Sequence, residues 1–143
     1  MKHLNKYQIV LASGSPRRKQ LLEQIDLEFE VVPSQINEDF SINLSPTDFV
    51  EHYAQEKAKD VAKSYPDKWV IGADTIVVFE SHILGKPKNE KDSFQMLKRL
   101  SGNTHQVITG VSIQNIKQDI SDSFHERTNV TFNTLSDNII NYY

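Results

Sequence analysis

The sequence predicts an α/β fold in which a mixed, twisted β-sheet is flanked by helices. Over residues 9–100, short apolar runs of strand length alternate with segments whose apolar residues recur at helical spacing. Over residues 106–134, β-branched residues alternate with polar ones, which is typical of strands. Strands that mix with crossover helices in this way indicate a layered α/β domain with a mixed sheet.

The first half of the chain contains two predicted strands and two predicted helices. Ser15 is a good N-cap and Pro16 fits the first helical position, so a helix begins there. The run Ser45-Pro46-Thr47-Asp48 is an equally strong start for a second helix. In chain order, we expect a strand at 9–12, a helix from 16, a strand at 29–33, a polar loop at 34–44 and a helix at 45–64.

The second half contains strands and one further full helix. The apolar run at 69–79 is interrupted by Gly72-Ala73-Asp74-Thr75, and Ile83-Leu84 leads into a loop at 85–87. A helix should start at Asn89 or Glu90 and stop at Ser101-Gly102. Strands are expected at 106–116 and 123–134, joined as a hairpin by 117–122. Ser136-Asp137 would cap a last helix that is too short to hold in isolation.

Composition limits the class of protein. A length of 143 residues predicts one compact domain, residues 1–143, with a sizeable core. A net charge of −3 provides no overall field for nucleic acid, and the absence of cysteine excludes disulfides, thiolate metal sites and a cysteine nucleophile. No apolar stretch reaches membrane-spanning length and no signal peptide is recognisable, so we expect a cytoplasmic protein without membrane or nucleic-acid partners.

A phosphate site is predicted where the first strand meets the first helix. The connecting residues read Ser13-Gly14-Ser15-Pro16-Arg17-Arg18. Unpaired N–H groups and a partial positive charge at a helix N-terminus favour an anion. Two hydroxyls and two guanidiniums make phosphate the favoured anion, because arginine matches phosphate oxygens bidentately. The alternative is a capped helix whose arginines are merely solvated.

Three more charged residues stand where the surrounding pattern is apolar or tightly turned. Lys57 falls within the apolar stripe of the predicted 45–64 helix, so it either meets a negative partner or extends to water. Asp74 interrupts the 69–79 run, either as a functional carboxylate or as a bend or cap at a strand end. Lys86 lies between Gly85 and Pro87, where it is either a functional cation or an ordinary turn residue. Together with the two arginines, they supply the charges that a metal–triphosphate complex requires.

In order and spacing, these residues resemble the Maf family over essentially all 143 residues. The resemblance is carried by Ala12-Ser13-Gly14-Ser15-Pro16-Arg17-Arg18, Glu56-Lys57-Ala58, Ile71-Gly72-Ala73-Asp74-Thr75, Gly85-Lys86-Pro87, Leu100-Ser101-Gly102 and Thr109-Gly110-Val111. The family comprises nucleoside triphosphate pyrophosphatases, also described as septum-formation inhibitors. The resemblance implies a Maf/inosine-triphosphatase-like fold with a central cleft, a homodimer, and Mg²⁺ or another divalent cation such as Mn²⁺ as cofactor.

The resemblance also implies roles for individual residues. A phosphate-binding loop would contain Ser13, Arg17 and Arg18. From the other side of the cleft, Lys57 and Lys86 would balance the triphosphate charge. Asp74 matches the catalytic carboxylate and Glu38 the second acidic position; either could activate water while the other holds the metal ion. The run at 72–75 resembles the branch that prefers dTTP and UTP to 7-methyl-GTP.

One departure from the family pattern affects the expected activity. Other members continue beyond the point matching Tyr143 into a segment resembling E-P-x-D-K-A-G-x-Y-x-I-Q-G, which these 143 residues lack. We therefore expect the front half of the phosphate site to form and catalysis to be impaired. The alternative function is a non-catalytic nucleotide-binding or cell-division regulatory module. Nucleic-acid binding ranks third, since the net charge is negative.

Overall fold

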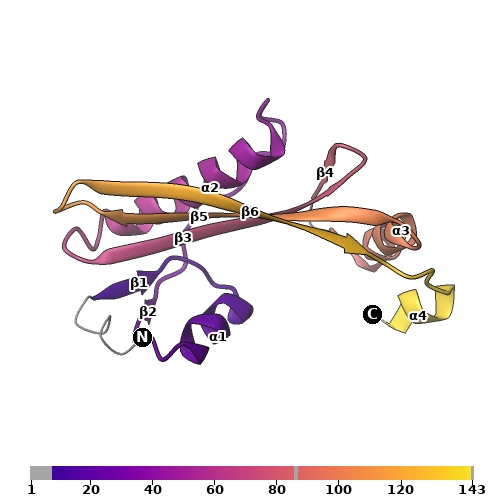
Figure 1. Cartoon of the computed structure of the whole chain (residues 1–143), viewed down its shortest axis with the longest axis horizontal. Coiled ribbons are helices and arrows are strands. Elements are labelled where there is room, and N and C mark those ends of the chain that lie inside the picture. The colour runs from indigo at the N-terminus through magenta and orange to yellow at the C-terminus, as the bar shows by residue number, and fades with distance from the viewer. Residues whose placement is uncertain (1–7, 86, 143) are drawn as a thin grey trace.

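The computed structural model describes residues 8–85 and 87–142 and has the expected α/β architecture (Figure 1). The predicted Lys86 site residue lies outside the described residues. In chain order, the elements are β1 (Ile9–Leu11), α1 (Pro16–Gln24), β2 (Glu30–Val31), α2 (Pro46–Ala62), β3 (Trp69–Phe79), β4 (His82–Leu84), α3 (Glu90–Leu100), β5 (Thr104–Asn115), β6 (Ile120–Thr131) and α4 (Asp137–Tyr142).

The strands form one mixed sheet in the order β2-β1-β3-β5-β6, with β4 paired to β3. β1 pairs in parallel with β2 and β3, whereas β3, β5 and β6 are antiparallel neighbours. The long strand β3 runs without interruption from Trp69 to Phe79. The apolar run is interrupted at 72–75, but the strand is not: these four residues belong to the ladder, and each pairs with a residue of β5.

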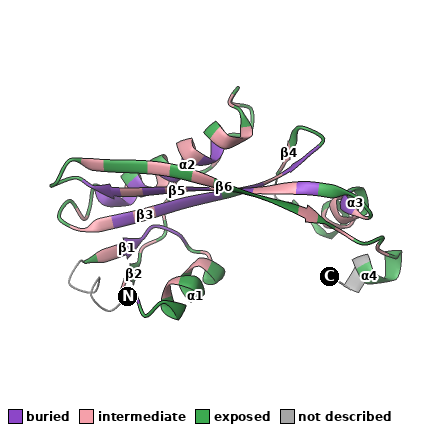
Figure 2. Cartoon of the chain, in the orientation of Figure 1, coloured by how far each residue is buried: buried purple, intermediate pink, exposed green. Residues whose placement is uncertain are grey.

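Helix α2 covers the central strands and forms the core with them. Ser45 caps it, and Pro46 occupies its first turn, as predicted. One cluster joins Phe49, Val50 and Tyr53 of the helix to buried residues of β3 and β5. In Figure 1, α1 lies on the other side of the strands from α2. No residue of α1 is buried, and Figure 2 shows α1 and β6 as largely exposed.

Two glycines allow α2 to lie directly against the sheet. A Cβ atom at Gly72 in β3 would overlap the backbone of Ala54 and Ala58, and one at Gly110 in β5 would overlap the carbonyl of Val50. Helix backbone therefore packs where side chains would normally separate the layers. This close approach brings α2 to Asp74, which pairs with Gly110 in the β3–β5 ladder.

Replacing Gly110 with alanine is expected to destabilise the fold by about 1–3 kcal/mol, because the added methyl group pushes α2 from the sheet. Urea denaturation measures the change. The matched control is Gly85→Ala, since a Cβ there meets no atom within 4 Å. Equal stability of the two variants would contradict the proposed close packing.

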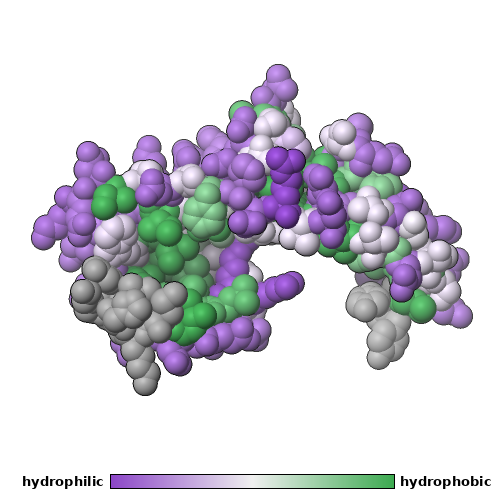
Figure 3. Space-filling view, in the orientation of Figure 1, coloured by the Kyte–Doolittle hydropathy of each residue, from purple (hydrophilic) through white to green (hydrophobic). Residues whose placement is uncertain are grey.

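The C-terminal end of the described chain packs beside α3. Ser101 at the end of α3 accepts a hydrogen bond from the Leu135 amide at 2.7 Å, and Lys98 lies 3.8 Å from Asp137. Ser136 caps α4, as expected. Figure 3 shows the molecule as an arch, with the part bearing α1 and the part bearing α3 and α4 projecting to the same side. No described helix combines the length and apolarity needed to cross a bilayer.

Candidate functional site

The loop between β1 and α1 leads into a capped helix N-terminus, as predicted. Ser15 is the N-cap of α1, and its Oγ accepts a hydrogen bond from the Arg18 amide. Ser13 is buried, and its Oγ accepts a hydrogen bond from the Ser15 amide at 3.3 Å. The loop follows β1, which ends at Leu11 while its neighbour β3 continues to Phe79. The turn therefore lies beside the part of β3 that extends beyond β1.

Arg18 bridges this loop to β3. Its Nη1 donates to Ser13 Oγ at 2.9 Å and to the Ala73 carbonyl at 3.3 Å, and its Nη2 donates to Thr75 Oγ1 at 2.8 Å. The Ala12 amide donates to the Ile71 carbonyl, which lies on the same edge of β3 two residues before Ala73. Because β1 has ended, no amide of a described strand reaches the Ala73 carbonyl from that side, and it can accept a hydrogen bond from Arg18.

Arg17 occupies a different position from its neighbour. It is exposed on α1, and its side chain makes no hydrogen bond or ion pair with another described residue. Successive residues on a helix point about 100° apart, so only one of two adjacent arginines can face β3. The structure thus brings Arg18, but not Arg17, to the strand that carries Asp74.

Lys57, Glu38 and Asp74 form a compact charged cluster. The ammonium of Lys57 lies 2.6 Å from Glu38 Oε1 and 2.9 Å from Asp74 Oδ1. The side chain of Lys57 is 15% exposed and that of Asp74 only 3%. Lys57 therefore meets two negative partners in place of extending to water. Asp74 lies in the middle of β3 and is not a cap at a strand end.

The surroundings of the two carboxyl groups move their pKa values in opposite directions. Burial, followed by the hydrogen bond with Glu38, raises the pKa of Asp74 to about 6. Partial burial opposes ionisation of Glu38, but hydrogen bonds with Asp74 and Lys57 outweigh it and lower the pKa of Glu38 to about 2. At neutral pH, Glu38 is firmly ionised, while Asp74 can accept a proton at modest cost.

These shifts predict how the stability of the metal-free protein depends on pH. Folded Asp74 keeps its proton up to about pH 6, whereas the unfolded chain loses it near the ordinary aspartate pKa of 3.8, so stability should fall between those values as pH rises. Glu38 has the opposite effect: its contribution to the stability of the fold is present above about pH 4.5 and is lost as the pH falls toward 2.

Chemical denaturation in EDTA at about pH 4.5, 5.5 and 7 tests the contribution of Asp74. Asp74→Asn should lack the wild-type decline across this window because asparagine does not titrate. Asp122→Asn, at an exposed position on β6, should retain it. Parallel curves for wild type and Asp74→Asn would contradict the raised pKa.

A cavity of about 400 Å³ joins the two groups of side chains. Its lining includes the loop from Ala12 to Ser15, Arg18, the Ser34–Glu38 segment in part, and Lys57. Hydroxyl, guanidinium, ammonium and carboxylate groups thus converge on one hollow, although they come from segments far apart in the chain. Such convergence of polar groups in a concave site is typical of ligand binding.

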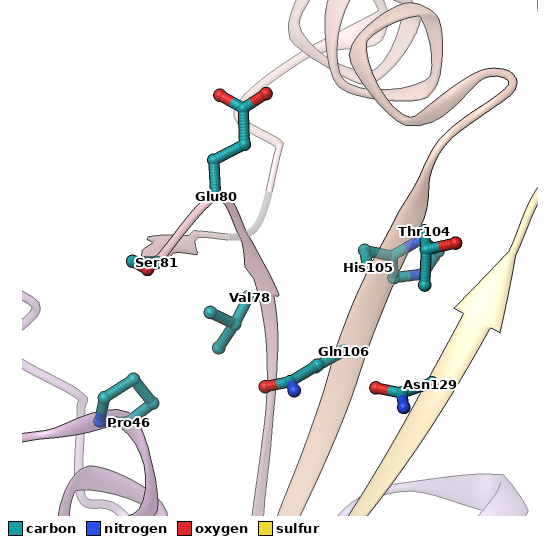
Figure 4. A pocket seen from close by; sticks show the side chains of 8 residues that line it. All are labelled: Pro46, Val78, Glu80, Ser81, Thr104, His105, Gln106 and Asn129. Atoms are coloured by element: carbon teal, nitrogen blue, oxygen red, sulfur yellow. The ribbon is translucent and has the colours of Figure 1, made fainter.

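A second hollow, of about 440 Å³, lies elsewhere, between the start of α2 and the β3–β5 ladder (Figure 4). The carboxamides of Gln106 and Asn129 point into it, with Glu80 at its rim. No lysine or arginine belongs to its described lining. Burial lowers the pKa of His105, which keeps that ring neutral. The hollow is therefore unsuited to a polyphosphate.

The acidic residues present fit one divalent cation that keeps several water ligands. Among the described residues, no group of three or more His, Cys, Asp or Glu side chains is placed to hold a metal ion. Glu38 and Asp74 nevertheless share one ammonium, and Asp74 Oδ2 is buried without a hydrogen-bond partner. Mg²⁺ requires only one or two carboxylates beside water and substrate phosphates.

Thr75 and Thr109 are site neighbours to which the sequence analysis assigned no role. Thr75 Oγ1 binds Arg18 and lies 3.0 Å from Thr109 Oγ1. The two threonines are paired in the β3–β5 register. The available signal was that each belongs to a segment that carries the family resemblance, 71–75 or 109–111, but their contact depends on strand register.

The fold and the site together define an α/β protein with a polar, cation-lined cavity beside the ends of its parallel strands. The chain matches the family described as Maf-like protein over residues 8–143, and it belongs to that family. Its relatives include the dTTP/UTP pyrophosphatase of Bacillus mycoides, 49% identical over 135 residues, which are 94% of this chain and 70% of that protein. The Bacillus cereus dTTP/UTP pyrophosphatase is 50% identical over 139 residues, with 97% and 68% of the two chains covered.

Solved structures support the same fold at low sequence identity. A HAM1 protein from Coxiella burnetii superposes with a TM-score of 0.60 at 16% identity, covering 86% of this chain and 71% of that one. A nucleoside-triphosphatase/dITP/XTP pyrophosphatase from Mycobacterium abscessus gives 0.55 at 12% identity, covering 87% and 73%. The expected Maf/inosine-triphosphatase-like architecture is thereby confirmed.

Proposed function

We propose that this chain is a nucleoside triphosphate pyrophosphatase that hydrolyses dTTP and UTP to the monophosphate and pyrophosphate. The observation that carries the proposal is the convergence of Arg18, Ser13, Lys57 and Glu38 on one cavity, with Asp74 paired to the same Lys57 ammonium. The nucleotide preference is supported by relatives at 49–50% identity named dTTP/UTP pyrophosphatase. The two kinds of support are independent, since one is geometric and the other comes from sequence.

The phosphate chain would bind between the loop and the lysine. Ser13 and the N-terminus of α1 supply neutral donors, and Arg18 supplies a guanidinium already oriented by three hydrogen bonds. Lys57, which also lines the cavity, supplies an ammonium. Arg17, exposed on α1, and Lys86 are proposed to contact the outer phosphates.

Hydrolysis would proceed by attack of water on the α-phosphorus. The new bond joins the water oxygen to phosphorus, and the bond from that phosphorus to the oxygen bridging to the β-phosphate breaks, releasing pyrophosphate. Asp74 accepts the proton of the attacking water, which its raised pKa permits. Glu38 stays ionised and would hold the divalent cation together with Asp74. A bound Mg²⁺ or Mn²⁺ would supply neutralisation of charge on the phosphoryl oxygens.

Several further properties are proposed on the family resemblance alone. The 143 residues act as one Maf-like domain, and the protein is a cytoplasmic homodimer. Sedimentation tests the dimer.

The central test measures pyrophosphate release from dTTP and UTP in the presence of Mg²⁺. Release from both, together with formation of the monophosphate, is expected. Release of orthophosphate without pyrophosphate would contradict cleavage at the α-phosphorus. Nucleotide binding without any release, unaffected by Asp74→Asn, would favour the alternative of a non-catalytic binding module.

A further inference from the structure

We infer that Thr109 is a positioning residue, which acts through Thr75 to hold the Arg18 guanidinium in the orientation that binds a phosphoryl group. The inference rests on the proposed function for the identity of the ligand, an inorganic or nucleotide polyphosphate. It assigns a role to the Thr109-Gly110-Val111 segment, whose first residue is hydrogen-bonded to Thr75.

The hydrogen bonds of Arg18 divide its donors between protein and cavity. A guanidinium carries five N–H donors in a rigid plane. Ser13 Oγ and the Ala73 carbonyl bind the two hydrogens of Nη1, and Thr75 Oγ1 binds one hydrogen of Nη2. The hydrogen bonds of the described residues leave two donors, one on Nη2 and one on Nε, for a ligand. The direction of those two donors depends on the three bonds that fix the plane.

The hydroxyl of Thr75 is itself oriented by Thr109. Arginine can only donate, so Thr75 Oγ1 must accept from Nη2. The contact of 3.0 Å with Thr109 Oγ1 then fixes the rotation of the Thr75 hydroxyl, whichever of the two hydroxyls donates. Thr109 lies directly opposite Thr75 in the β3–β5 register, so the ladder sets this contact.

The position of the pair favours a role in ligand binding over a role in sheet stability alone. Thr75 is exposed and Thr109 half-buried, so neither hydroxyl needs a protein partner to satisfy its hydrogen bonding. The chain provides an internal comparison in Thr104 and Thr131. These residues form an equivalent cross-strand pair at 2.8 Å, between β5 and β6, and no arginine of the described chain is hydrogen-bonded to it.

The test measures the affinity for inorganic pyrophosphate by calorimetry in the full chain, so that no turnover is needed. Thr109→Val keeps the shape and removes the hydroxyl; we expect pyrophosphate binding to weaken about threefold to tenfold, the effect of one typical hydrogen bond. Thr109→Ser should restore the affinity. Thr104→Val, the matched control, should leave it unchanged, and melting temperatures show whether each variant is folded.

A second variant keeps the test decisive if Thr109→Val perturbs the sheet. In an Arg18→Lys background, the guanidinium that Thr75 binds is absent, so Thr109→Val should cause no further loss of pyrophosphate affinity. Equal losses in both backgrounds, or equal affinity of Thr109→Val and wild type, would overturn the inference. If pyrophosphate binding depends on Thr109 but no nucleotide is hydrolysed, the proposed function fails and the positioning role stands.

Discussion

Replacing Asp74 with asparagine is expected to lower the turnover of dTTP and UTP about a thousandfold while nucleotide binding is largely retained. The asparagine side chain has nearly the same shape but cannot accept the proton of the attacking water. General-base catalysis is worth about 10²–10⁴ in rate, and Asp74 is the carboxyl group with the raised pKa. Single-turnover kinetics at saturating Mg²⁺ would measure the loss in the chemical step.

Glu38→Gln separates the two carboxyl roles. If Glu38 mainly holds the cation, its replacement should raise the Mg²⁺ concentration needed for half-maximal turnover, with a smaller loss at saturation. The reverse outcome, in which Asp74→Asn is rescued by more Mg²⁺ and Glu38→Gln is not, would exchange the two assignments. Asp122→Asn, on the exposed face of β6, is the matched control and should turn over like the wild type.

Folding defects should not account for the loss in Asp74→Asn. A buried carboxylate is costly unless it is fully paired, and Asp74 Oδ2 has no hydrogen-bond partner in the described structure. The asparagine variant should therefore be at least as stable as the wild type at neutral pH. A large fall in the urea midpoint would mean that Asp74 is chiefly structural.

Most of the fold could be predicted from local signals. Ser15, Ser45 and Asn89 cap the three longer helices at the expected positions. Each cap is a short-range interaction between a side chain and an amide three residues away, so nearby sequence contains it. The continuity of β3 could not be predicted, because the fit of Gly72 and Asp74 into the ladder depends on β5 and on the backbone of α2.

The residue types of the site were predictable, whereas its contacts were not. Lys57 stood out as a charge on an apolar helix face, but the pattern left open whether it had a partner. Its two partners come from an irregular loop and from β3, at sequence separations of 19 and 17 residues. Likewise, the sequence could not distinguish Arg18 from Arg17, because that distinction depends on how α1 is rotated relative to β3.

Replacing Lys57 with methionine is expected to destabilise the metal-free protein by about 2–3 kcal/mol. Methionine keeps much of the apolar stem but removes the ammonium that lies between Glu38 and Asp74. Two carboxyl groups are then left close together without a cation, and breaking a buried ion pair by removing one partner is strongly destabilising. Urea denaturation in EDTA measures the loss, and Lys59→Met, at an exposed position of the same helix, is the matched control.

Divalent cations should reverse that loss, because Lys57 occupies the position between the two carboxyl groups that a metal ion would need. Mg²⁺ or Mn²⁺ should therefore stabilise Lys57→Met more than wild type, with about tenfold tighter metal binding, since no ammonium has to be displaced. Affinity for the triphosphate should change in the opposite direction, because one cation on the cavity wall is lost. Weaker binding of both metal and nucleotide would instead mean that Lys57 organises the carboxyl groups and does not compete with the metal.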